Sequence, residues 1–307
     1  MEIRPIDFPV VDKVLRQKLE TLIPPFFHTF LDNQDPYGIR SNLLGVALFI
    51  DDHPVGVGLA SLYSKLHNAH IHVLEITPLK AQPSLYKTLL QAITQKLMEN
   101  GIRIATYNYF KEAPATPTWE NIFVEEKWEG PQSLMIECLF HRDQFDPDWW
   151  YKKMHFEKGF EEILLKDLST AEKNDLLRRW EQGSIPDYIY PLDRENAQIE
   201  YGNSLALRHQ GKIVGWMVTH RLSHDLIRYS SLYLEDEFSS TGYWLKLLID
   251  ALYIHRDHIL DANQGLLEIN LNQISKSWLN FIQRRLFPQA SQIKHKQTFW
   301  KSFVLNP

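Results

Sequence analysis

Histidines are the residues of this sequence best suited to proton transfer, because imidazole changes its charge near neutral pH. Thirteen of them are scattered along the chain. His70 and His72 stand two positions apart in an apolar run, and alternate residues of a strand project to the same side. Such a pair can accept protons in catalysis, or it can simply lie on the half-exposed face of a sheet.

Two other histidine pairs have spacings that occur in metal sites. His220 and His224 are four positions apart, and His255 and His258 are three apart. The sequence places no cysteine or carboxylate beside either pair, so we expect no metal. It also contains no G-x-S-x-G elbow, P-loop or dinucleotide fingerprint.

The composition is that of a folded protein long enough for two domains. The chain has 307 residues, of which 44% are hydrophobic and 23% charged. Its net charge of −5 makes nucleic acid an unexpected partner. Cys138 is the only cysteine, which excludes an intrachain disulfide and fits a reducing compartment. We expect a cytoplasmic protein that does not bind membranes, because the sequence shows neither a signal peptide nor a long apolar span.

The sequence repeats itself once. Residues 43–59 read as strand, polar turn and strand, and residues 204–217 repeat this pattern. Gly56 and Gly215, each preceded by a valine, are 159 positions apart. A strand, an amphipathic helix, a second strand, a late helix and a last strand follow each hairpin, at nearly the same offset. The strands expected directly after the hairpins cover residues 71–76 and 229–234, and the strands expected after the amphipathic helices cover residues 102–109 and 266–271.

This repetition predicts two α/β domains with mixed sheets, covering residues 1–145 and 155–307. The join is expected within 143–158, where Trp149, Trp150 and Tyr151 follow a short acidic segment. We interpret these aromatic residues as packing between the two copies rather than as a ligand site. The alternative is one large irregular α/β domain.

The order of elements in each copy resembles the GNAT superfamily of acyl-CoA-dependent N-acyltransferases. Its most specific features are a fourth strand that runs into a turn and an apolar helix, and a late helix that ends before an aromatic residue, Trp128 or Phe287. The resemblance covers nearly the whole chain, twice. It implies two tandem GNAT-like domains and acetyl-CoA as co-substrate.

The resemblance also implies where coenzyme A binds. Free N–H groups at a helix start hold the pyrophosphate, and glycines let the backbone approach it. The second copy keeps one glycine, but Trp244 replaces the other, and serines in this loop can instead cap the helix. The first copy has no glycine at 81–86, and Pro83 removes a donor. The expected cofactor-binding residues are Leu232 and Leu234, through main-chain pairing with the pantetheine arm, and Ser239, Ser240, Thr241, Gly242 and Tyr243.

The resemblance implies a base on the fourth strand and a tyrosine acid on the late helix. The base position holds His70 in the first copy, with His72 beside it, and Arg228 in the second. An arginine cannot accept a proton. The acid positions hold Phe123 and Ile282, so neither copy keeps the tyrosine. Tyr229, Tyr233 and His220 are further polar residues that nothing in the sequence singles out.

We therefore predict a tandem GNAT-like protein that transfers an acetyl group from acetyl-CoA to a small-molecule or peptide amine. One alternative is a non-catalytic protein of this fold that binds an acyl-CoA or another ligand. A second alternative is an interaction scaffold without a ligand, which the missing glycines favour. The acceptor cannot be assigned from sequence, because acceptor pockets are built from variable loops.

Overall fold

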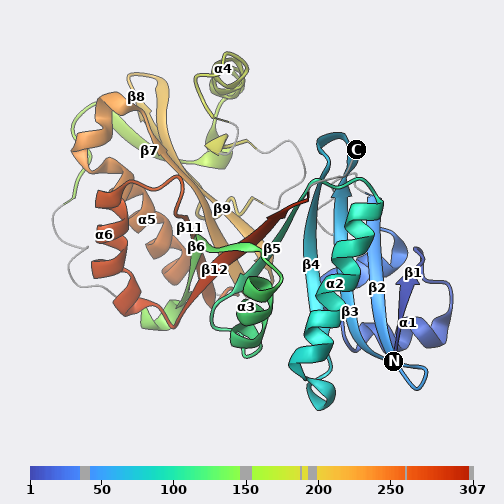
Figure 1. Cartoon of the computed structure of the whole chain (residues 1–307). Coiled ribbons are helices and arrows are strands. Elements are labelled where there is room, and N and C mark those ends of the chain that lie inside the picture. Colours follow the sequence, from blue (N-terminus) through green and yellow to red (C-terminus); the bar gives the residue numbers. More distant parts are fainter. Residues whose placement is uncertain (35–41, 146–153, 187–188, 193–198, 260, 304–307) are drawn as a thin grey trace. The chain divides into compact units, whose positions relative to one another are not determined.

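The structure is a computed structural model that describes residues 1–34, 42–145, 154–186, 189–192, 199–259 and 261–303 (Figure 1). It divides into two compact units. Unit 1 comprises Met1–Leu134 and His295–Pro307, and unit 2 comprises Met135–Lys294. The three aromatic residues expected at the join, 149–151, lie outside the described residues.

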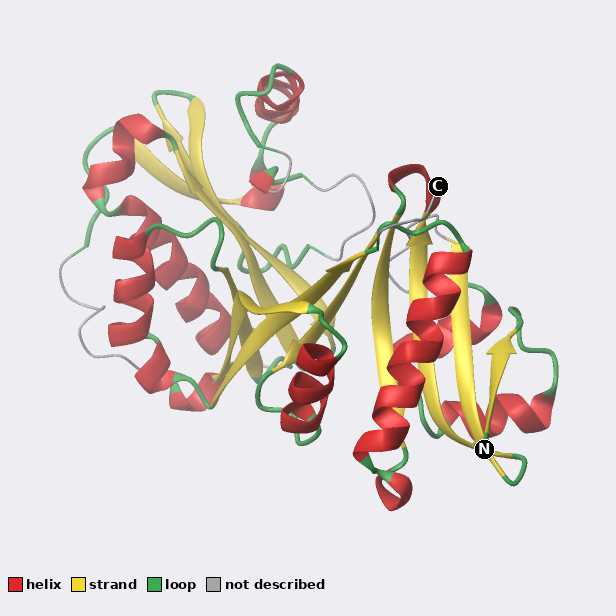
Figure 2. Cartoon of the chain, in the orientation of Figure 1, coloured by secondary structure: helices red, strands yellow, loops and turns green. Residues whose placement is uncertain are grey.

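Unit 1 is a mixed sheet with helices on both faces. Its strand order is β1-β2-β3-β4-β5-β12, and β4 with β5 is the parallel pair. Helices α2 and α3 cover one face, and α1 and the 3₁₀ helix Pro25–Asp32 cover the other (Figure 2). The elements are β1 (Glu2–Ile6), α1 (Lys13–Glu20), β2 (Asn42–Ile50), β3 (His53–Tyr63), β4 (Asn68–Ile76), α2 (Pro83–Glu99), β5 (Ile104–Phe110), α3 (Thr116–Glu125) and β12 (Gln292–Ser302).

Unit 2 repeats this plan. Its strand order is β7-β8-β9-β10-β11-β6, and β10 with β11 is the parallel pair. Helices α5 and α6 cover one face, and α4 packs on the other. The elements are β6 (Glu129–His141), β7 (Phe160–Leu164), α4 (Thr170–Glu181), β8 (Leu205–His209), β9 (Lys212–Ser223), β10 (Leu226–Leu234), α5 (Tyr243–His258), β11 (Gln264–Asn270) and α6 (Lys276–Arg285).

Both predicted hairpins are confirmed. The β2–β3 turn is Asp51-Asp52, with φ of 48° and 59°, and the β8–β9 turn is Gln210-Gly211, with φ of 49° and 81°. Two-residue turns with positive φ match the right-handed twist of the strands they join. The residues that indicate these turns in the sequence are therefore the residues that adopt positive φ in the structure.

The helical spacing predicted for α2 is also confirmed. Leu85, Leu89, Ile93 and Leu97 are all buried, and they pack on the sheet of unit 1. A run of leucines and isoleucines at intervals of four residues forms one apolar stripe along a helix, so its burial fixes which face meets the sheet. Helix α5 buries three consecutive residues, Leu247, Leu248 and Ile249, so its buried surface is wider than a single stripe.

The last strand of each sequence half belongs to the sheet of the other unit. Strand β6 follows α3 in the first half, yet residues 135–141 pair with β11 of unit 2. Strand β12 ends the second half, yet residues 296–302 pair with β5 of unit 1. The sequence pattern predicts each strand but not its neighbour, because β5 and β11 both offer an edge that an antiparallel strand can cover. The exchange therefore departs from the expected assignment of one closing strand to its own half.

Candidate functional site

The two parallel strands of unit 2 diverge, and a cavity opens where they part. β10 and β11 are in register from Leu226↔Gln264 to Tyr229↔Leu267. Beyond this point a cavity of about 730 Å³ lies against the rest of both strands, which we call the β10–β11 groove. Leu232 and Leu234, two of the expected cofactor-binding residues, line it.

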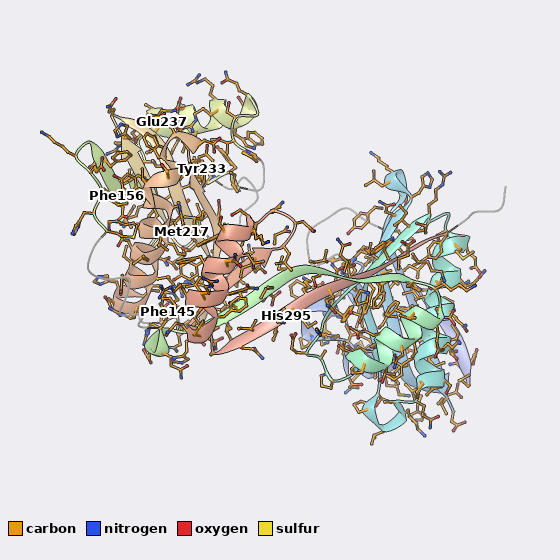
Figure 3. The ribbon with its side chains drawn as sticks, turned by 60° about the vertical axis from the view of Figure 1, so that its left-hand side comes forward. Phe145, Phe156, Met217, Tyr233, Glu237 and His295 are labelled. Atoms are coloured by element: carbon orange, nitrogen blue, oxygen red, sulfur yellow. The ribbon has the colours of Figure 1, made fainter. Side chains whose placement is uncertain are left out.

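The groove is lined from both faces of the sheet. On the face of α5 and α6 the lining is apolar and includes Leu248 and Ile282. On the face of α4 the lining comes from the segment after that helix, with Ser184 and Ile189. Tyr233 of β10, labelled in Figure 3, also lines the groove. One ligand can therefore lie along the apolar wall while another approaches from the opposite face.

A β-bulge in β10 lies at the wall of the groove. The register with β9 passes from Tyr229↔Thr219 to Ser231↔Val218, so Ser230 is the extra residue. Bulges are frequent beside active sites because they re-aim a side chain. Ser230 Oγ lies 2.7 Å from His220 Nδ1 and accepts a hydrogen bond of 3.0 Å from Nε of Arg228. His220, which nothing in the sequence singles out, is thus hydrogen-bonded to Ser230, which lines the groove.

The charged residues among the described lining of the groove are both acidic, Asp236 and Glu268. The side chain of Glu268 is 30% exposed, and its Oε2 lies 3.5 Å from Nη1 of Arg228. Arg228 occupies the expected base position, where it cannot act as a base. It instead bridges Glu268 and Ser230. Nothing in the sequence singles out Glu268, because a lone glutamate in a strand carries no signal of what it faces.

The expected phosphate loop lies between β10 and α5. Ser239, Ser240 and Thr241 belong to an exposed 3₁₀ helix, Asp236–Thr241. Gly242, with φ of 81°, is the N-cap of α5, so neither serine caps that helix. Tyr243 is buried, and its N–H donates to Thr241 Oγ1 at 3.2 Å. The N–H of Tyr243, expected to bind phosphate, is therefore already engaged.

Two substitutions relative to the expected pattern have visible consequences in unit 2. Trp244, in place of the second glycine, packs edge-on against Trp278 with ring centroids 4.4 Å apart. Trp278 lines the groove, so Trp244 packs against one residue of its apolar wall. Ile282, in place of the tyrosine acid, also lines the groove and has no proton to donate.

In unit 1 the parallel strands β4 and β5 also diverge, but aromatic rings pack beside these two strands. β4 and β5 are in register only as far as Ile71↔Tyr107. The Tyr107 ring stacks on Phe123 at 5.1 Å, and Phe123 stacks on Phe299 at 4.8 Å. Burial raises the pKa of the Tyr107 phenol. A hollow of about 400 Å³ in this unit has a lining from α2 and α3 alone, without β4 or β5.

The two expected catalytic histidines lie together in unit 1, on β4. Their rings are 4.6 Å apart, which confirms that they project to the same side. His70 Nδ1 is 2.8 Å from Thr106 Oγ1, and His72 Nε2 is 2.9 Å from Ser61 Oγ. Neither histidine lines the β10–β11 groove or the hollow between α2 and α3.

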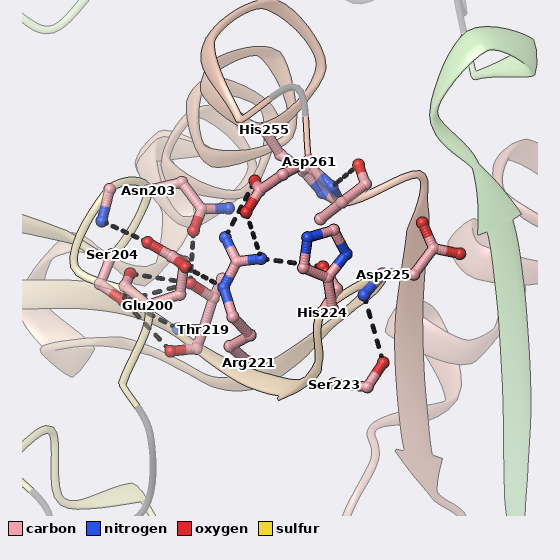
Figure 4. Close-up of polar contacts among 12 residues, drawn as sticks. Glu200, Asn203, Ser204, Thr219, Arg221, Ser223, His224, Asp225, His255 and Asp261 are labelled. Carbon is pink, nitrogen blue, oxygen red and sulfur yellow. Dashed lines mark hydrogen bonds and ion pairs between the residues drawn. The ribbon is translucent and has the colours of Figure 1, made fainter.

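A polar network holds the start of β10 and the end of α5 (Figure 4). Arg221 of β9 donates to Glu200 Oε2 at 2.7 Å and to Asp261 Oδ2 at 3.1 Å. Nearby, His255 Nε2 donates to the carbonyl of Ala262, so its Nδ1 accepts the hydroxyl proton of Tyr229 at 2.9 Å. Burial lowers the pKa of His255, which keeps the ring neutral in this role. The network fixes β10 just before the bulge.

Across the described ranges, no three His, Cys, Asp or Glu side chains gather closely enough to hold a metal ion. None of the helices in those ranges is long and apolar enough to cross a membrane.

No family model and no curated protein match the sequence, whereas solved structures match it along its length. A tandem GNAT protein from the clavulanic acid biosynthesis pathway has a TM-score of 0.61 at 11% identity, over 100% of this chain and 99% of that one. A GCN5-related N-acetyltransferase from Sphaerobacter thermophilus has a TM-score of 0.55 at 11% identity, over 99% and 96%. A GCN5-related glucosamine N-acetyltransferase region of a fungal multi-domain GH3 β-N-acetylglucosaminidase has a TM-score of 0.59 at 12% identity, over 98% of this chain and 38% of that one.

Two of these three likenesses cover nearly the whole length of both chains compared. They confirm the fold that the element order predicted. This chain has the fold of a tandem GNAT protein.

Proposed function

We propose that unit 2 transfers an acyl group, most simply acetyl, from acyl-coenzyme A to a small-molecule or peptide amine. The observation that carries this proposal is the divergence of β10 and β11 beside a cavity of about 730 Å³. Beyond Tyr229, main-chain groups of β10 face the groove and can pair with the amides of a pantetheine arm. Such pairing needs no particular side chain, so Leu232 and Leu234 are compatible with it.

The phosphates of the coenzyme would lie at the start of α5. This helix is sixteen residues long, and its dipole favours an anion at its first turn. Ser239, Ser240 and Thr241 are exposed there and have small side chains. Gly242 has a positive φ, which other residues adopt only with strain.

The acceptor would enter from the face of α4 as an ammonium ion. Glu268 and Asp236 are the charged residues of the described lining and attract a positive charge into the groove, although Arg228 pairs with Glu268 and offsets part of its charge. An ammonium group must lose a proton before its nitrogen can attack a thioester. We assign that proton to the carboxylate of Glu268, in preference to His70 and His72 of unit 1.

The similar structures support acyl transfer to nitrogen. Two of the three similar structures are named as N-acetyltransferases, and one of these two as a glucosamine N-acetyltransferase region. These names describe those proteins. For this chain they favour an amine as acceptor without choosing which one.

The test combines binding and turnover. Calorimetric titration with coenzyme A measures binding, and consumption of acetyl-CoA against amines, polyamines, amino acids and peptides measures transfer. Glu268→Gln is expected to lower kcat by about 10²-fold or more and to leave coenzyme A binding unchanged. His70→Ala is the matched control and should alter neither quantity. Loss of turnover in His70→Ala with full activity in Glu268→Gln would place the chemistry in unit 1.

A coenzyme-binding protein without turnover is the second candidate. Ile282 at the acid position favours it, because no tyrosine is there to protonate the leaving thiolate. Tight binding of coenzyme A together with no transfer to any amine of the panel would support this candidate over the first.

A further inference from the structure

Ser230 has the surroundings of an activated nucleophile. Its hydroxyl lies 2.7 Å from Nδ1 of His220, a distance at which imidazole can take the hydroxyl proton. The guanidinium of Arg228 donates to the same oxygen at 3.0 Å and so stabilises negative charge that develops on it. Glu268, at 3.5 Å from Arg228, holds the guanidinium in place. The other acceptor near this hydroxyl, the carbonyl oxygen of Arg228, is farther away at 3.4 Å than the imidazole at 2.7 Å.

The position of Ser230 also suits attack on a bound thioester. Ser230 lines the β10–β11 groove and precedes Leu232 and Leu234 on the same strand. If the phosphates lie at the start of α5, the pantetheine arm runs back along β10 towards the bulge. The four residues from Leu234 to Ser230 span about 13 Å of strand. The thioester end of the arm then reaches Ser230 rather than the phosphate loop.

We propose that Ser230 accepts the acyl group from acyl-coenzyme A as an ester, so that the protein works through a covalent acyl-serine intermediate. This inference rests on the proposed binding of acyl-coenzyme A in unit 2. It adds an activity: in the absence of an amine, water releases the acyl group, and the protein acts as an acyl-coenzyme A hydrolase.

The proposed acyl transfer takes place in two steps. His220 Nδ1 takes the proton of Ser230 Oγ as that oxygen attacks the thioester carbonyl. The new C–O bond forms, the C–S bond breaks, and the proton on His220 passes to the departing thiolate. In the second step an amine or water attacks the ester and the C–O bond to Ser230 breaks. His220 takes the proton of the incoming nucleophile and returns one to Ser230.

Unit 1 supplies a matched control, because it also contains a hydrogen-bonded serine and histidine on neighbouring strands. The serine and the histidine have exchanged strands relative to unit 2. Ser61 lies on β3, and His72 is the bulge residue of β4. The His72 ring packs against Phe27 and Phe30, with centroids 5.5 Å and 5.2 Å apart. Neither residue of this pair lines the hollow between α2 and α3. Ser61→Ala therefore removes an equivalent hydrogen bond without touching the proposed nucleophile.

The experiment uses the full chain and acetyl-CoA without any amine. Release of free thiol is followed spectroscopically, and the protein is digested for mass spectrometry. We expect an acetyl group on the peptide that carries Ser230, together with steady thiol release. Ser230→Ala should lose both, and His220→Ala should slow thiol release by about 10²-fold or more. Ser230→Cys should retain the acyl group as a thioester adduct, and Ser61→Ala should behave as the unaltered protein.

Binding of coenzyme A is measured on every variant, which separates the two proposals. If coenzyme A binds and amines are acetylated, but no adduct forms on Ser230 or on the cysteine variant, transfer is direct and the acyl-serine step is overturned. The same conclusion holds if Ser230→Ala releases thiol at the rate of the unaltered protein. If coenzyme A does not bind at all, the proposed function fails and this inference fails with it.

Discussion

Single residues decide what the groove of unit 2 can do. Glu268 and Asp236 make its polar part acidic, whereas Ile282 occupies the wall where the resemblance implies a proton donor. A thiolate that leaves without a donor must take its proton from water or from a base that has just been protonated. The absence of a hydroxyl at residue 282 is therefore expected to limit the rate of transfer.

Replacing Ile282 with tyrosine tests this limit. Ile282→Tyr puts a phenol at the groove wall and is expected to raise kcat by about 10-fold or more, because a positioned acid contributes to such steps. The measurement is the steady-state rate of acetyl transfer with the best amine of the panel. Phe123→Tyr is the matched control in unit 1. Phe123 is fully buried among aromatic rings, so the new hydroxyl should cost about 1–3 kcal/mol of stability and bring no gain in rate.

At the scale of elements, strand β7 meets helix α5 through acidic side chains. Burial, and then the nearby carboxylate of Asp250, raise the pKa of Glu162 to about 8. Lys246 of α5 also pairs with Asp250. A carboxyl group in such surroundings is protonated in the folded protein at neutral pH, whereas in the unfolded chain it is ionised.

This contact gives a pH-dependent contribution to stability. Because the folded pKa of Glu162 lies above the unfolded value of 4.5, its contribution is fully present below about pH 4.5 and is lost as pH rises towards 8. Glu162→Gln resembles the protonated form, so it should match the unaltered protein at pH 4 and become more stable than it as pH approaches 8. Urea unfolding across this range measures the difference. Glu161→Gln, which alters an exposed ion pair with Arg208, should change stability by only about 0.5 kcal/mol.

At the scale of the whole molecule, the exchange of closing strands ties each unit to the distant half of the sequence. Phe299 of β12 is fully buried in the core of unit 1, where it stacks on Tyr109 at 5.7 Å and on Phe123. Phe140 of β6 is buried in the core of unit 2. Neither core is complete without a strand from the other half of the chain.

Two reciprocal substitutions test the exchange. Phe299→Ala should destabilise unit 1 by about 3–5 kcal/mol, although residue 299 is near the end of the chain, because a large buried ring leaves a cavity. Phe140→Ala should destabilise unit 2 in the same way. Hydrogen exchange followed by mass spectrometry reports protection in β4 and β5 separately from β10 and β11. Loss of protection in β10 and β11 on Phe299→Ala, with β4 and β5 unaffected, would mean that the closing strands are not exchanged in solution.

The sequence by itself determined the two copies, their hairpins and their buried helix faces. These features rest on local patterns: polar residues where a two-residue turn needs positive φ, and leucines at the spacing of one helix face. The element order also predicts the tandem GNAT fold. Leu232 and Leu234, for which cofactor binding stays a prediction, line the groove, because their place depends on strand order.

Only the tertiary structure decided where a ligand can lie. Both units contain diverging parallel strands, but rings from α3, β5 and β12 fill the core beside one pair, while the other pair has a groove. The grouping of Ser230, His220, Arg228 and Glu268 likewise depends on a bulge and on the register of three strands. Local sequence patterns carry no information about side-chain packing between distant segments, nor about which sheet edge a closing strand will cover.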